Sequence, residues 1–104
     1  MQRDLVDFLL SDFRERPGMY LGSYSLSSLP ILVAGFTIAC NYYDTSKAGL
    51  DRFYDFMEWF EKRHSLERSS SWTLPFLEMT KCNEKAALDL FLSELEIYAS
   101  ESCR

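Results

Sequence analysis

The chain carries one histidine, His64, so acid–base catalysis near neutral pH would need this imidazole or a carboxyl group with a raised pKa. No Ser–His–Asp, Cys–His or paired-carboxylate arrangement accompanies it. His64 follows the expected end of a helix, where a cation interacts favourably with the last carbonyl groups. We therefore expect His64 to be a solvated helix cap, and we expect no catalytic residue and no enzymatic activity.

The cysteines do not indicate a metal centre or a disulfide framework. Cys40, Cys82 and Cys103 are odd in number and lack the spacing of metal ligands. The sequence also has no glycine-rich phosphate loop with its lysine. We expect reduced thiols, no metal and no cofactor.

Acidic residues at helical spacing are the best candidates for recognition of a partner. Asp51, Asp55 and Glu58 are separated by four and three residues, so they share one side of a helix. Neighbouring acidic and aromatic residues extend this side. The candidate binding residues are Tyr43, Asp44, Asp51, Asp55, Glu58 and Glu61. Negative charge beside aromatic rings suits a basic partner, but a solvated face partly neutralised by Arg52 and Lys62 has the same pattern.

Composition predicts one globular domain over residues 1–104. Of these residues 47% are hydrophobic and 15% aromatic, which is enough for a core and unlike a disordered tail. The net charge of −5 argues against binding a phosphate backbone and permits a basic protein partner. We expect no nucleic-acid ligand.

Nothing in the sequence predicts export or insertion into a membrane. The N-terminal residues lack the anatomy of a signal peptide. The apolar run Leu29–Cys40 is shorter than the roughly 20 residues of a membrane-spanning helix, and it contains Pro30 and Gly35. We expect a cytoplasmic protein that does not contact a membrane.

Hydrophobic periodicity predicts an all-α fold, a compact bundle of four to five helices around a central apolar helix at about 29–43. The other expected helices cover residues 4–16, 47–63, 72–79 and 83–100. The helix at 29–43 is apolar on nearly every side, which is typical of a helix with several neighbours. Gly35 costs this helix about 1 kcal/mol relative to alanine, so we expect it to allow a close helix crossing or to make room for an aromatic ring.

Nearly the whole chain resembles small bacterial immunity proteins of toxin-immunity loci, including those of contact-dependent growth inhibition systems. The matching positions are Arg16-Pro17-Gly18-Met19-Tyr20-Leu21-Gly22, Ser25-Leu26, Leu29, Gly35-Phe36, Phe53, Phe56, Trp59, Phe60, Ser71-Trp72, Ala87, Phe91 and Leu95. Pro30 and Pro75 depart from the pattern, because ordinary helix formers are expected there. The resemblance implies a cytosolic inhibitor that blocks the active site of a cognate toxin domain, a nuclease, with EndoU-type ribonucleases among the candidates.

A second hypothesis is a small helical adaptor or regulatory protein that dimerises or binds partners through exposed aromatic side chains. Tyr20, Tyr24, Trp59 and Trp72 would form its contact surface. Under the immunity hypothesis the free chain is expected to be a monomer.

Overall fold

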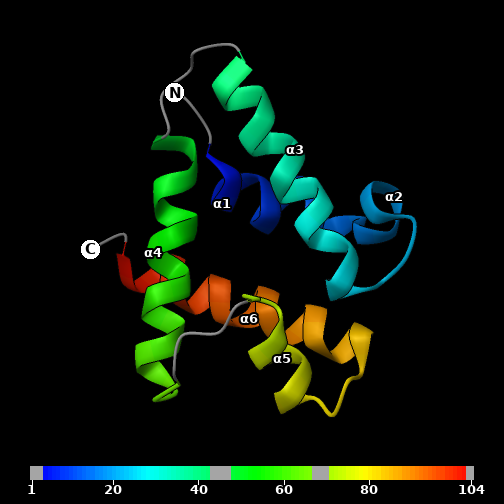
Figure 1. The fold of residues 1–104 in the computed structure, drawn as a ribbon, viewed down its shortest axis with the longest axis vertical. Coiled ribbons are helices and arrows are strands. Elements are labelled where there is room, and N and C mark those ends of the chain that lie inside the picture. The colour runs from blue at the N-terminus through cyan, green and yellow to red at the C-terminus, as the bar shows by residue number, and fades with distance from the viewer. Residues whose placement is uncertain (1–3, 43–47, 67–70, 103–104) are drawn as a thin grey trace.

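The computed structural model describes residues 4–42, 48–66 and 71–102, and within these ranges every regular element is a helix (Figure 1). The all-α fold class expected from the sequence is therefore confirmed. The elements are α1 (Leu5–Phe8), η1 (Leu9–Phe13), α2 (Pro17–Leu21), η2 (Leu26–Ser28), α3 (Leu29–Tyr42), α4 (Ala48–Arg63), α5 (Leu74–Met79) and α6 (Glu84–Ser102).

The first expected helix is present, but it contains a π-helical turn. The Asp4 carboxylate caps α1 by accepting a hydrogen bond from the Asp7 amide at 2.9 Å, and the Asp7 carboxylate accepts one from the Asp4 amide at 3.1 Å. The wider turn η1 follows where the Ser11 hydroxyl donates to the Asp7 carbonyl at 2.7 Å. The chain leaves this helix at Arg16, as the following Pro17 predicts.

Short-range signals also explain the later helix boundaries. Pro17 begins α2, a short helix that lies outside the helices expected from the sequence, and Gly22 ends it with φ +76°. Pro75 lies in the first turn of α5, where its missing amide proton is not needed. Asn83 Oδ1 accepts a hydrogen bond from the Ala86 amide at 3.0 Å and so caps α6, close to the start expected for the last helix.

The core is built mainly by α4 and α6. Phe56 and Phe91 meet edge to face with their centroids 5.6 Å apart, and Phe60 stacks on Phe76 of α5 at 4.2 Å. Helix α6 contacts η1, η2, α4 and α5, and Figure 1 shows it crossing beneath α4. The radius of gyration is 13.5 Å, close to the roughly 13 Å of a compact chain of this length.

Helix α3 is not the central helix that the sequence led us to expect. It packs mainly against α2 and η2 at the edge of the molecule (Figure 1), and among its residues 29–39 only Leu29 and Val33 are buried. Ile31 and Ile38 are 78% and 65% exposed. The prediction failed because an apolar composition favours burial but does not say which helices supply the neighbours. The aromatic rings of α4 and α6 fill the core instead.

Gly35 also differs from its prediction. A Cβ atom added there would have no described atom within 4 Å, so no helix crossing or ring in the described chain requires this glycine. Despite the apolar character of α3, none of the described helices combines the length and the hydropathy needed to cross a bilayer.

Candidate functional site

The acidic candidates on α4 lie together around one hollow. Asp51, Asp55, Glu58 and Glu61 line an open hollow of about 670 Å³ between α4 and the start of α5. They converge because residues three and four apart occupy one side of an α-helix. Tyr43 and Asp44, the other two candidates, lie outside the described residues.

Aromatic and apolar side chains form the rest of the wall. The lining residues besides the carboxylates are Tyr54, Met57, Phe60, Trp72 and Pro75. Tyr54 is 56% exposed, so part of its ring is open to solvent at this wall. Trp72 is half-buried and meets Phe53 edge to face at 5.4 Å, which fixes the indole beside the hollow. A lysine or arginine side chain entering here would meet both carboxylates and aromatic faces.

Two of the four carboxylates have partners within the chain. Tyr98 Oη donates a hydrogen bond to Asp55 Oδ2 at 2.6 Å, and burial together with this carboxylate raises the pKa of Tyr98 to about 12. Glu58 Oε1 lies 3.3 Å from Lys62 Nζ in an exposed pair, which water and salt screen strongly. The side chains of Asp51 and Glu61 make no hydrogen bond or ion pair with any other described residue. Among the described residues nothing therefore neutralises these two charges.

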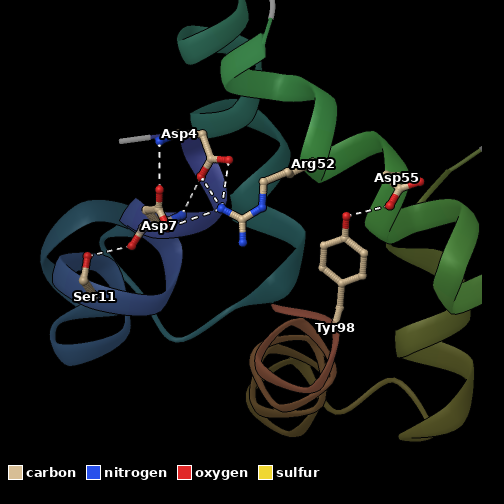
Figure 2. A network of polar contacts seen from close by, with 6 residues as sticks. All are labelled: Asp4, Asp7, Ser11, Arg52, Asp55 and Tyr98. Carbon is tan, nitrogen blue, oxygen red and sulfur yellow. Dashed lines mark hydrogen bonds and ion pairs between the residues drawn. The ribbon is translucent and has the colours of Figure 1, made fainter. Parts of the chain in front are cut away.

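Arg52 does not neutralise the hollow, contrary to the alternative considered from the sequence. Figure 2 shows its guanidinium directed at α1, where Nη1 lies 3.0 Å from Asp4 Oδ2 and 3.3 Å from Asp7 Oδ1. Partial burial raises the pKa of Asp7, but hydrogen bonds from the Asp4 amide and from Arg52 outweigh it, so this pKa is lowered overall. The network ties α1 to α4, and the bond between Asp55 and Tyr98 ties α4 to α6 (Figure 2).

His64 is not the solvated cap that we expected. Its imidazole packs on Phe60 with a centroid distance of 4.6 Å, and Nε2 lies 2.7 Å from Oε1 of Glu94, which is only 6% exposed. Arg63 Nε adds a contact of 3.3 Å to the other Glu94 oxygen. The prediction failed because Glu94 comes from α6, 30 positions further along the chain. His64 does not line the hollow beside α4.

The described residues include no group of three or more histidine, cysteine, aspartate and glutamate side chains placed to hold a metal ion. The chemistry available at the α4 hollow is therefore that of carboxylates and aromatic rings. It can attract and surround a cationic group.

Known proteins add no further assignment. No family model, curated protein or solved structure matches the chain.

A second hollow was not foreseen from the sequence. It has a volume of about 680 Å³, lies between α1, α2 and α3, and is lined mostly by apolar side chains, including Phe8, Tyr20, Ile31 and Phe36. One feature of the sequence indicates an apolar surface in this part of the chain: no charged residue lies between Arg16 and Asp44.

The four aromatic residues of the adaptor hypothesis do not share one surface. Tyr20 and Tyr24 are exposed, and Tyr20 lines the apolar hollow. Trp59 and Trp72 are half-buried and belong to the aromatic packing of α4 and α6.

Proposed function

We propose that this chain is an immunity protein that acts in the cytoplasm by binding a cognate toxin domain, a nuclease, and blocking its basic active-site cleft. The observation that carries the proposal is the hollow beside α4, where four carboxylates converge and two of them have no described internal partner. Nuclease clefts are basic because they bind phosphates, so such a surface attracts them.

Shape and charge support the same proposal. The ridge of α4 carries a carboxylate at nearly every turn, and the hollow beside it has room for a lysine or arginine side chain from the rim of the cleft. Tyr54 and Trp72 would contribute the aromatic contact area that frequently dominates binding energy in protein interfaces. The core and turn positions that resemble immunity proteins agree with a helical inhibitor without chemistry of its own.

The test begins with a search beside this gene for a reading frame that encodes the C-terminal toxin end of a large secreted protein, and it uses that toxin domain. We expect the chain to protect cells that express this domain and to bind it in a pull-down. Reversing both unpaired charges, Asp51→Lys with Glu61→Lys, should weaken binding about 30-fold, or about 2 kcal/mol, and more at low salt.

The matched control reverses two exposed charges on the first helix, Asp12→Lys with Glu15→Lys, and should leave affinity close to that of the parent chain. If the α4 variant binds as tightly as this control, the binding surface proposed here is wrong even where protection persists. If the parent chain gives no protection and no binding, the proposed function itself is refuted.

A further inference from the structure

Arg52 lies on α4 within reach of one of the carboxylates that make its hollow negative. It precedes Asp55 by three positions, and an arginine and an aspartate at this spacing on a helix are close enough to form an ion pair. Asp55 lines the hollow beside α4, which we call the acidic hollow. An ion pair between Arg52 and Asp55 would place a positive charge at the rim of the acidic hollow and cancel part of its attraction for a cation.

Asp4 and Asp7 hold the guanidinium of Arg52 on another side of α4. Nη1 lies 3.0 Å and 3.2 Å from the two Asp4 oxygens and 3.3 Å from Asp7 Oδ1. Both carboxylates also belong to the capping box of α1, which fixes their positions independently of Arg52. The Asp4 side chain is only 14% exposed, so water screens this contact less than it would screen a contact with the exposed Asp55.

Tyr98 satisfies Asp55 without cancelling its charge. The phenol donates to Asp55 Oδ2 at 2.6 Å, and its ring meets Phe56 and Trp59 edge to face, each at a centroid distance of 5.6 Å. Burial and then the Asp55 carboxylate raise the pKa of Tyr98 to about 12, so the phenol is a neutral donor at pH 7. Arg52 acts on this pKa in the opposite direction, which means that its charge is within electrostatic reach of the Asp55–Tyr98 pair (Figure 2).

We propose that Asp4 and Asp7 set the charge of the acidic hollow by keeping Arg52 away from Asp55. Asp4 and Asp7 are positioning residues, because neither lines the acidic hollow and both act through Arg52. This role rests on the proposed function, since it takes the acidic hollow as the surface that meets a basic partner. The affinity for such a partner then depends on the cap of α1, which contributes no residue to the lining.

The test measures binding of a hexa-arginine peptide to the full chain by isothermal titration calorimetry. At about 0.15 M salt, charges more than about 8 Å apart are largely screened. Asp4→Asn with Asp7→Asn removes both charges and keeps side-chain oxygens that can cap α1. We expect this variant to bind about 5-fold more weakly than the parent, near the upper end of what one exposed ion pair contributes. The matched control, Asp12→Asn with Glu15→Gln, makes the same change in net charge at exposed positions and should weaken binding less than about 2-fold.

Arg52→Gln distinguishes a positioning role from a structural one. Added to the Asp4→Asn, Asp7→Asn variant, it removes the released cation and should restore the affinity to within about 2-fold of the parent. Added to the parent, it should change the affinity less than about 2-fold, because Arg52 is already held away from the acidic hollow. Damage to α1 would not be repaired by a further substitution on α4, so a purely structural role predicts no recovery.

The possible failures are distinguishable. Equal weakening by the control variant, or no recovery with Arg52→Gln, would overturn the role of Asp4 and Asp7 and leave the proposed function standing. A parent chain that does not bind the peptide, or binding that survives Asp51→Lys with Glu61→Lys, would overturn the acidic hollow as a cation site and this role with it. Protection against the toxin domain is a separate measurement, and it alone decides whether the chain is an immunity protein.

Discussion

Glu84 joins the start of α6 to the turn that leads into α3, and its replacement tests the electrostatic reasoning directly. Oε1 accepts hydrogen bonds from Ser25 Oγ at 3.0 Å and from the Ser27 amide at 2.9 Å, while Oε2 accepts one from Ser27 Oγ at 2.7 Å. The negative charge also lies in the first turn of α6, where the helix dipole favours it. Glu84→Gln preserves the size of the side chain and removes the charge.

The expected cost follows from these contacts. A hydrogen bond to a charged group contributes about 1.5–3 kcal/mol when it is well protected. Ser27 is exposed and water can replace part of what is lost, so we expect a total near 2 kcal/mol rather than the sum of three bonds. For a domain of this size that corresponds to a fall in melting temperature of about 8–16 °C and a urea midpoint lower by about 1 M.

The pH dependence of this loss is the sharper test. The hydroxyl and then the amide of Ser27 lower the pKa of Glu84 from its ordinary value of 4.5. A carboxyl group with a lowered folded-state pKa stabilises the fold above its unfolded value, and that contribution disappears as the pH falls through the folded value. The difference between parent and Glu84→Gln should therefore be full at pH 7 and shrink well below pH 4.5.

Urea unfolding of both proteins across this pH range measures the effect. Glu78→Gln is the matched control, because Glu78 is exposed and its side chain has no hydrogen bond or ion pair with another described residue. A destabilisation of Glu84→Gln that stays constant from pH 7 to acid pH, or that only equals the control, would refute the reasoning.

Two further predictions concern the interior. Phe91→Ala removes a fully buried ring that meets Phe56 at 5.6 Å and Phe76 at 5.5 Å, so it should cost about 3–5 kcal/mol in urea unfolding. A loss below about 1 kcal/mol would mean that the ring is not enclosed. Glu94→Ala should cost about 1.5–3 kcal/mol because it leaves the His64 imidazole without its carboxylate. A double-mutant cycle with His64→Ala should give a clear coupling energy, and a coupling near zero would contradict the pairing.

Helix positions could be predicted from the sequence because their signals are local. The expected range 4–16 ends just before Pro17, where the first helix stops, and the expected range 83–100 nearly coincides with α6. The position of α3 at the edge of the fold could not be predicted, because its apolar composition does not indicate which other helices pack against it. The π-helical turn at η1 was also not predicted. The Ser11 hydroxyl donates a hydrogen bond to the Asp7 carbonyl there, but serines in ordinary α-helices make the same hydrogen bond without forming a π-helical turn.

Only the part of the candidate site that lies on a single helix could be predicted from the sequence. Spacing alone placed Asp51, Asp55, Glu58 and Glu61 on one side of α4, and the structure gathers them around one hollow. The partner of Asp55 could not be foreseen, because Tyr98 lies 43 positions away on another helix. The apolar hollow depends in the same way on the packing of three elements that are separate in the sequence.

The position of Trp72 gives the molecule a built-in optical probe. Its indole touches Phe53 and Phe91 on one side and borders the acidic hollow on the other. A cationic group that enters the hollow would change the surroundings of this fluorophore without any attached dye. Replacing the other indole, Trp59→Phe, would leave a single emitter whose spectrum follows occupancy as ligand is added.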